Sequence, residues 1–124
     1  MKLIDTLDIA DNMRIAIVGS GGKTTLMFRL AAELGSNVIV TTTTHLSREQ
    51  AGWGNQEFII SGEIDIAPVL EKVSGVCVLH SGYTDDGKVS GLSESSMKKL
   101  LEISKIPVII EADGAKCKPL KAPA

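Results

Sequence analysis

The sequence predicts an α/β fold in which a mostly parallel β-sheet is flanked by helices. Short runs that are almost entirely apolar alternate with longer segments whose apolar residues recur every three to four positions. Apolar runs of this kind are typical of strands covered on both faces, and such alternation is typical of parallel sheets with right-handed crossovers. Hydrophobic residues make up 44% of the 124 residues and aromatic residues only 3%, so we expect one domain, residues 1–124, with an aliphatic core.

The first strand and helix are predicted from the N-terminal third of the chain. Residues 14–18 are mostly apolar and β-branched, which predicts a buried strand. Residues 23–34 carry a leucine at every fourth position, which predicts the apolar face of a helix, and Gly35 is a typical helix end. These leucines are Leu26, Leu30 and Leu34, and Met27 and Ala31 lie beside them on the same face.

Four further apolar runs predict the remaining strands of the sheet. Each is short, rich in β-branched residues and followed by polar or glycine-containing sequence. Cys77 lies inside one of them, in a Val-Cys-Val segment, and we expect it in the core. The runs are residues 37–41, 58–60, 75–80 and 107–111.

Two more helices are predicted from capping residues. Asp65 is expected to cap a helix that runs to about residue 73. Ser93 is expected to cap a second helix, and residues 85–88, which are acidic and contain a glycine, predict a turn. The apolar face of the second helix is formed by Met97, Leu100, Leu101 and Ile103.

Composition excludes several functional classes. A net charge of −2 provides no basic field for nucleic acid, and four aromatic residues cannot form a stacking platform for single strands. No apolar run approaches the ~18 residues of a membrane span, and acids interrupt the N-terminal apolar stretch that a signal peptide needs. The cysteines, Cys77 and Cys117, are too few for a disulfide scaffold, so we expect a cytoplasmic protein without membrane or nucleic-acid partners.

The strongest chemical signal is a glycine-rich loop between the first strand and the first helix. Its glycines allow the backbone N–H groups to approach a phosphate, and the helix N-terminus adds a favourable dipole. Lys23 can reach the outer phosphates, and the Thr24 hydroxyl can bind Mg²⁺. The loop consists of Gly19, Ser20, Gly21, Gly22, Lys23, Thr24 and Thr25.

This loop is shorter than the usual phosphate-binding pattern, G-x-x-x-x-G-K-[ST]. Ile17 occupies the position of the first glycine in that pattern. The order of the elements nevertheless suits phosphate binding: a strand comes first, then the glycines, then the Lys-Thr-Thr run and a helix. We therefore predict a P-loop NTPase-like nucleotide site; the alternative is an ordinary glycine-rich turn.

Polar residues follow the other predicted strands as well. Ligands of parallel α/β sheets bind beyond the carboxyl ends of the strands, so residues 19–25, 41–45, 80–83 and 111–118 should share one edge. Glu111 and Asp113 end the last strand and are candidates to hold Mg²⁺ through water or to assist an attacking water. Their order of importance is open, and ordinary loop carboxylates are the alternative.

The threonine run and two other polar segments have weaker functional signals. Residues 41–44 are all threonine and can end a strand and cap the next segment, or supply hydroxyls to a nucleotide or metal. His45 is a candidate for proton transfer or substrate contact, with a solvated loop histidine as the alternative, and His80 is a weaker candidate. Cys117 lies between two lysines that favour thiolate, which suggests sulfur, selenium or redox chemistry; surface lysines near a polyphosphate are the alternative.

Three segments together resemble the YqeC-type selenium-dependent hydroxylase accessory proteins. They are residues 18–27, 40–46 and 110–123. The resemblance implies a P-loop nucleotide-binding protein that acts in maturing molybdenum hydroxylases carrying labile selenium. It assigns the nucleotide to the loop from Gly19 to Thr25, and it implies a molybdenum hydroxylase or its cofactor-maturation proteins as partners. Members of this family are longer, so we expect residues 1–124 to be an N-terminal part whose fold is incomplete at the C-terminus.

Three functions are compatible with these residues. The first is a Mg²⁺-dependent protein that binds and hydrolyses ATP or GTP, and no Asn-Lys-x-Asp segment for reading guanine is present to decide between them. The second is an ATP-dependent ligase or kinase, because the short loop is similar to that of the Mur amide ligases. The third is a nucleotide-binding scaffold without catalysis. For the first we expect catalytic roles for Lys23, Glu111, Asp113 and His45, with Thr24 and Asp113 at the metal.

Overall fold

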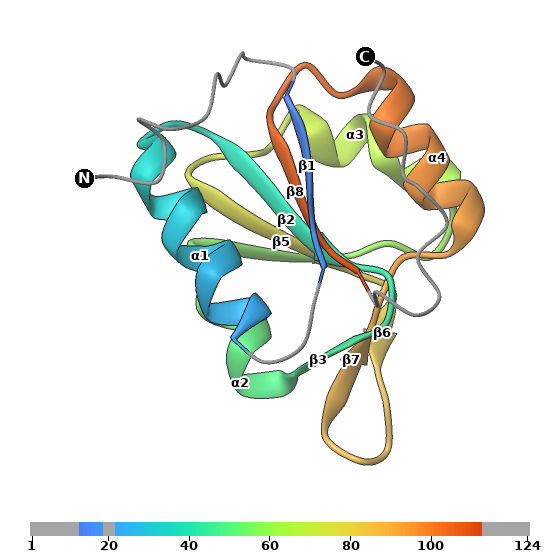
Figure 1. Ribbon diagram of the computed structural model, residues 1–124. Helices are drawn as coiled ribbons and strands as arrows, with labels where there is room; N and C mark the ends of the chain where they lie inside the picture. The colour runs from blue at the N-terminus through green and yellow to red at the C-terminus, as the bar shows by residue number, and fades with distance from the viewer. Residues whose placement is uncertain (1–12, 19–21, 113–124) are drawn as a thin grey trace.

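The computed structural model describes residues 13–18 and 22–112, and at its centre lies a parallel five-stranded sheet (Figure 1). Every neighbouring pair of these strands runs parallel. The predicted apolar runs supply the strands, with ends that shift by one or two residues. In spatial order the strands are β1 (Arg14–Ile17), β8 (Val108–Glu111), β2 (Val38–Thr42), β5 (Val76–His80) and β4 (Gln56–Ile59).

The last described strand, β8, lies between β1 and β2. Ile17 is level with Glu111 on one side, and Thr42 is level with Glu111 on the other. Because the three strands are parallel, their carboxyl ends reach the same edge of the sheet. This register brings residues almost 100 positions apart in the sequence to one rim.

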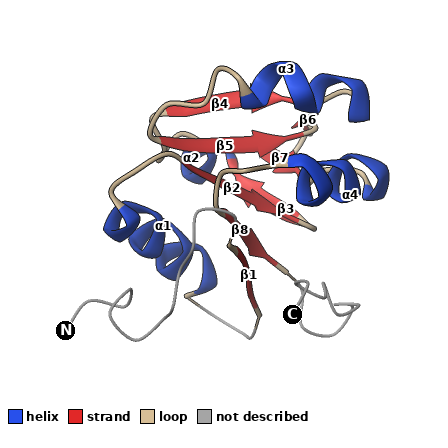
Figure 2. Cartoon of the chain, turned by 90° about the horizontal axis from the view of Figure 1, so that it is seen from above, coloured by secondary structure: helices blue, strands red, loops and turns tan. Residues whose placement is uncertain are grey.

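Helices cover both faces of the sheet, which confirms the predicted α/β arrangement. Figures 1 and 2 show α1 and α2 on one side and α3 and α4 on the other. Two separate clusters of buried aliphatic residues match these two layers. The helices are α1 (Lys23–Leu34), α2 (Arg48–Ala51), α3 (Ile66–Leu70), which follows the 3₁₀ turn η2 (Glu63–Asp65), and α4 (Glu94–Ile103).

All the connections within the parallel sheet have the same hand. The two that move towards β4, from β1 to β2 and from β2 to β4, carry helices on the α1 face. The two that move back towards β1 carry α3 and α4 on the opposite face. A connection that runs in the opposite direction across the opposite face of the sheet has the same handedness. All four crossovers therefore share one handedness, as expected for βαβ units.

Helix α1 has the predicted bounds, and most of its predicted apolar face is buried. Met27, Leu30 and Ala31 are buried as predicted, whereas Leu26 is 39% exposed. The apolar spacing therefore located the helix and the centre of its buried face, and Leu26 lies at the edge of that face. Gly35 ends the helix in the left-handed region, as its position predicted, with its N–H bonded to the Ala32 carbonyl.

Helix α4 confirms its predicted cap, whereas the helix predicted from Asp65 begins at Ile66 as expected but is wrong in its cap and length. The Ser93 hydroxyl accepts a hydrogen bond from the Ser96 N–H, as the sequence predicted. Asp65 instead ends the 3₁₀ turn in a helical conformation and makes no cap. Its carboxylate accepts from the Ser61 N–H, 2.9 Å away, and the α-helix that follows ends at Leu70.

A second, antiparallel sheet of three short strands adjoins the carboxyl end of the parallel sheet, and the sequence patterns did not predict it. Its strands have only two or three residues, too few for a periodic signal. The predicted turn at residues 85–88 overlaps the connection between two of them, residues 84–87, with Gly87 at φ 80°. In spatial order they are β3 (His45–Ser47), β7 (Lys88–Ser90) and β6 (Gly82–Tyr83).

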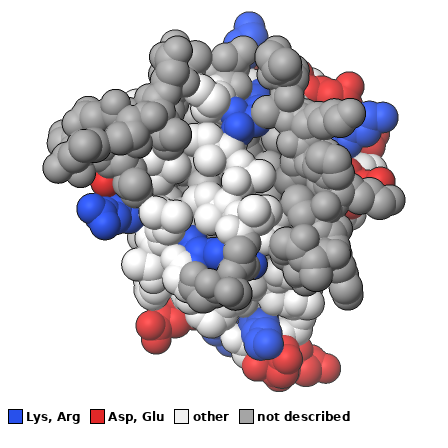
Figure 3. Space-filling view, viewed as in Figure 1, with Lys and Arg blue, Asp and Glu red and all other residues white. Residues whose placement is uncertain are grey.

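The described surface and core agree with several expectations from composition. Cys77 is fully buried, as predicted, and burial raises the pKa of its thiol to about 12. Figure 3 shows acidic and basic side chains interspersed around a mostly neutral surface on one face. Within residues 13–18 and 22–112, no helix is both long and apolar enough to cross a bilayer.

Gly91 allows the segment after β7 to touch the end of β2. Its N–H donates to the Thr44 carbonyl over 2.7 Å. A Cβ atom placed on Gly91 would collide with the Thr42 carbonyl oxygen and lie 2.9 Å from the Thr43 carbonyl carbon. Both neighbours are backbone, so no flexible side chain can move aside.

We predict that Gly91→Ala lowers the free energy of unfolding by about 1–3 kcal/mol, the usual cost of forcing an extra methyl into packed structure. Gly62→Ala is the matched control, because nothing lies within 4 Å of its added Cβ and its φ of −166° suits alanine. Chemical unfolding of the two variants measures the difference. Equal free energies would contradict the close backbone approach at Gly91.

Candidate functional site

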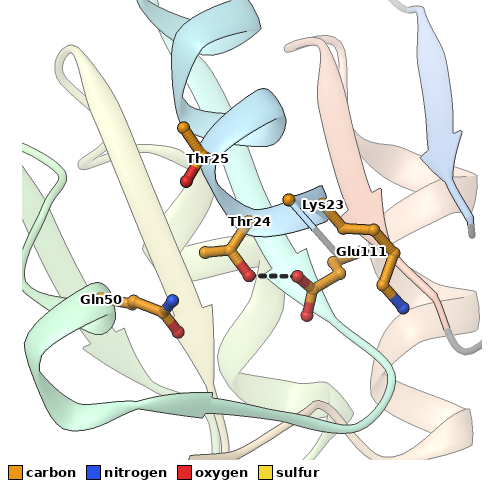
Figure 4. A pocket seen from close by; sticks show the side chains of 6 residues that line it. Lys23, Thr24, Thr25, Gln50 and Glu111 are labelled. Carbon is orange, nitrogen blue, oxygen red and sulfur yellow. Dashed lines mark hydrogen bonds between the residues drawn. The ribbon is translucent and has the colours of Figure 1, made fainter. Parts of the chain in front are cut away.

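A pocket of about 220 Å³ lies at the start of α1, beyond the carboxyl end of β8 (Figure 4). The predicted loop contributes four of its described lining residues, the last strand contributes a fifth and α2 contributes a sixth. Gly19, Ser20 and Gly21 lie outside the described residues. The lining residues are Gly22, Lys23, Thr24, Thr25, Gln50 and Glu111.

Gly22 sets the entry into α1. Its φ of 72° lies in the left-handed region, which glycine adopts without steric cost. The helix begins at the next residue, Lys23, and its N-cap residue, Gly22, has no side chain with which to cap it. The backbone N–H groups of the first turn have no partner within the helix, and the helix dipole is positive at this end. This end of α1 is therefore suited to an anion.

Lys23 joins the start of α1 to the end of β8. Its ammonium donates a hydrogen bond to the Ala112 carbonyl over 3.1 Å. A lysine ammonium has three donors, so this contact leaves two for another acceptor. The side chain is half-buried, and Figure 4 shows it on the Glu111 side of Thr24.

Thr24 and Glu111 form the central contact of the pocket. The Thr24 hydroxyl donates to one carboxylate oxygen of Glu111 in a short hydrogen bond (Figure 4). The other carboxylate oxygen accepts from the Thr42 hydroxyl over 3.4 Å, and Glu111 is only 6% exposed. Of the two carboxylates that the sequence left unranked, Glu111 lies at the loop, and Asp113 is outside the described residues.

The four threonines have different positions. Thr41 is fully buried and donates to the Leu79 carbonyl over 2.8 Å, so it serves the end of the strand. Thr42, also fully buried, bonds to Glu111 and belongs to the pocket's supporting network. Thr43 is exposed and Thr44 half-buried. Thr41 therefore confirms the strand-end alternative, and a hydroxyl contact of this run to a nucleotide or metal stays a prediction.

His45 lies near the pocket in sequence but is not among its described lining residues. It begins β3, is exposed, and is paired in register with Ser90 of β7. Its role in proton transfer stays a prediction.

His80 takes part in a network that sequence reasoning missed. Its ring is fully buried, with Nε2 2.6 Å from Glu57 and Nδ1 accepting from the Gly82 N–H over 3.1 Å. Since Nδ1 accepts, we assign the proton to Nε2, which donates to Glu57. Both ring nitrogens are therefore occupied, and His80 joins β5, β4 and β6 rather than offering a free base.

Glu57 also accepts a hydrogen bond from the Tyr83 hydroxyl, and the Arg48 guanidinium lies over the Tyr83 ring, 4.7 Å from its centre. Desolvation acts to raise the pKa of Glu57, but the hydrogen bonds from Tyr83 and His80 and the nearby positive charge outweigh it and lower the pKa. The bond to Glu57 raises the pKa of Tyr83. These contacts connect α2 to the far edge of the sheet.

Two oxygen-bearing side chains of the pocket, those of Thr24 and Glu111, could hold Mg²⁺ together with the phosphates of a ligand. In the described part of the chain, no three His, Cys, Asp or Glu side chains gather where they could hold a metal. Mg²⁺ commonly keeps several waters and binds through one or two protein oxygens together with substrate phosphates. The Thr24 hydroxyl and the Glu111 carboxylate provide such oxygens.

We predict that Thr24→Val lowers the free energy of unfolding by about 1–3 kcal/mol, because it deprives the buried Glu111 carboxylate of its shortest hydrogen bond. Thr25→Val is the control: Thr25 is the next residue of α1, it is exposed, and the same change there should stay within about 0.5 kcal/mol. Chemical unfolding without nucleotide or metal compares them. A similar stability for both variants would argue against the Thr24–Glu111 contact.

Comparison with known proteins agrees with the motifs. The family model described as YqeC protein matches residues 15–124. A relative from Escherichia coli (strain K12), named "Uncharacterized protein YqeC", is 36% identical over 114 residues, which cover 88% of this chain and 43% of the relative. The chain thus spans less than half the length of this relative. No solved structure matches the chain. The family match and the identity to this relative show that the chain belongs to the YqeC family.

Proposed function

We propose that the chain binds a nucleoside triphosphate, ATP or GTP, with Mg²⁺ at the start of α1 and hydrolyses it. The observation that carries the proposal is the contact between Thr24 and the buried Glu111, beside Lys23 and the uncapped helix N-terminus. A hydroxyl and a carboxylate that meet next to a lysine and free backbone donors suit a phosphate group with its metal ion.

The N-terminus of α1 and Lys23 would bind the phosphates. Free N–H groups of the first turn and the helix dipole attract anions, and no acidic residue in this turn opposes them. The Lys23 ammonium, held at the end of β8, has donors left for an outer phosphate. Because these donors are fixed before the ligand arrives, they can also stabilise charge that develops during phosphoryl transfer.

Thr24 and Glu111 would hold the metal. Mg²⁺ supplies charge neutralisation of the phosphate oxygens when it is bound. Thr24 would turn its hydroxyl oxygen towards the ion, and Glu111 would hold water next to it. In hydrolysis, water attacks the terminal phosphorus, the bond to the leaving diphosphate oxygen breaks, and a diphosphate and inorganic phosphate form. Asp113, two residues beyond Glu111, stays a second candidate for the metal.

We further propose that this hydrolysis serves the maturation of selenium-dependent molybdenum hydroxylases, with the hydroxylase or its cofactor-maturation proteins as partners. The support is the YqeC-type resemblance of the loop, the Thr-His segment and the acidic segment. Lys116, Cys117 and Lys118 would then lie three to seven residues beyond the metal-site carboxylates in the sequence. This order would bring a nucleophilic sulfur close to the nucleotide site along the chain.

We predict that Lys23→Ala weakens binding of Mg·ATP or Mg·GTP by about 10- to 100-fold, which corresponds to the loss of a charged hydrogen bond. Lys98→Ala removes an exposed lysine from α4, on the opposite face of the sheet, and should leave the affinity unchanged. Calorimetric titration of the full chain measures both, with thermal unfolding as a check on folding. If the wild type binds neither nucleotide, or if both variants bind equally well, the proposal fails.

A further inference from the structure

Gln50 lines the pocket but belongs to none of the sequence motifs from which the site was predicted. It lies in α2, on the segment between β3 and β4, and it faces the pocket next to Thr24 and Thr25. Figure 4 shows Gln50 on one side of Thr24 and Lys23 on the other. An anion at the start of α1 would therefore have Gln50 on the side that Lys23 does not cover.

The orientation of the Gln50 amide follows from a capping box at the start of α2. The Gln50 N–H donates to the Ser47 hydroxyl over 3.0 Å, and the Ser47 N–H donates to the Gln50 side-chain carbonyl over 3.1 Å. An N–H donor needs an oxygen acceptor, so Oε1 is the atom at Ser47. The amide nitrogen, with its two N–H groups, is then the end available to the pocket.

Helix α2 is fixed by contacts that do not depend on a ligand. Ala51 is fully buried, and the Arg48 N–H donates to the Gly87 carbonyl over 3.2 Å. Trp53, just after the helix, packs edge-on against Phe28 of α1, with ring centres 5.4 Å apart. These contacts fix α2 relative to α1, so the Gln50 amide is positioned with little further loss of conformational freedom.

The chemistry of the pocket favours an acceptor as the partner of the amide. Lys23 and the first-turn N–H groups are donors, and the Thr24 hydroxyl already donates its single hydrogen to Glu111. Among the described lining residues, Glu111 is the only acid, and each of its oxygens accepts from a hydroxyl, that of Thr24 or that of Thr42. The side-chain amide N–H groups of Gln50 thus add to the donors that line the pocket. Such a set of donors suits the oxygens of a phosphate chain.

We propose that Gln50 is a phosphate-binding residue of this site, donating from its side-chain amide nitrogen to an oxygen of the bound phosphate chain. The inference rests on the proposed nucleotide site and adds a contact from α2 to those from α1 and β8. It assigns α2 a direct part in holding the ligand, on the side of Thr24 that faces away from Lys23.

Gln50→Glu tests the proposal without removing the cap. A glutamate carboxylate can accept from the Ser47 N–H, as in the common Ser-x-x-Glu capping box, so the fold should be retained. The change replaces two N–H donors with a negative oxygen facing the phosphates. We expect at least 10-fold weaker binding of Mg·ATP and of inorganic triphosphate with Mg²⁺.

Glu49→Gln and the double variant Glu49→Gln/Gln50→Glu control for net charge. Glu49 is the exposed neighbour in α2, and the double variant keeps the net charge of the wild type. We expect Glu49→Gln to bind like the wild type or slightly more tightly, and the double variant to lose most of its affinity. If the double variant binds like Glu49→Gln, the phosphate contact is refuted.

Gln50→Ala provides a second test in case the glutamate variant folds poorly. It removes the donors without adding charge, and Ser47→Ala loosens the same cap without touching the amide. Weaker triphosphate binding for Gln50→Ala than for Ser47→Ala supports the proposal, and equal binding overturns it. A loss seen with ATP but not with inorganic triphosphate would place Gln50 at the nucleoside and also overturn it.

Lys23→Ala, measured in parallel, separates the two claims. If the wild type binds nucleotide and Lys23→Ala weakens binding while every Gln50 variant matches its control, the nucleotide site stands and the role of Gln50 is refuted. If the wild type binds neither nucleotide nor inorganic triphosphate, both claims fail together.

Discussion

The contact between Thr24 and Glu111 is the interaction on which the rest of the site depends. It exists because β8 lies between β1 and β2 in parallel register, so that Ile17, Glu111 and Thr42 end at one level. The start of α1 is then held against the end of β8 twice, through the Thr24 hydroxyl and through the ammonium of Lys23. The same strand order that completes the core thus places a lysine, a hydroxyl and a carboxylate around one helix N-terminus.

Sequence patterns predicted the fold well wherever a segment is long and buried. The inner strands β2, β5 and β8 were recognised because both of their faces are covered, and α1 and α4 were recognised by spacing and by the cap at Ser93. The prediction failed where individual hydrogen bonds, rather than a periodic pattern, decide local structure. Asp65 bonds back to the Ser61 N–H instead of capping a helix. The strands of the small antiparallel sheet are too short for a pattern and depend on one another for their hydrogen bonds.

For the site, the sequence motifs indicated individual residues but did not indicate which distant residues contact one another. The glycine loop indicated Lys23 and Thr24, and the end of the last strand indicated Glu111, but only the strand register shows that Thr24 and Glu111 meet. Gln50 could not be connected to the pocket from sequence, since its position depends on how α2 packs near α1. The Ser-x-x-Gln pattern at residues 47–50 is nevertheless a capping-box signal and would have located the start of α2.

The most direct test of the account is a crystal structure of the chain with Mg²⁺ and a non-hydrolysable nucleoside triphosphate. The account predicts the phosphate chain at the N-terminus of α1, with Lys23 on an outer phosphate and the ion beside the hydroxyl oxygen of Thr24. The Thr24 hydroxyl would then face the ion, with Glu111 holding water next to it. A nucleotide bound elsewhere, or one bound while Thr24 still donates to Glu111 and no ion lies between phosphate and hydroxyl, would contradict the account.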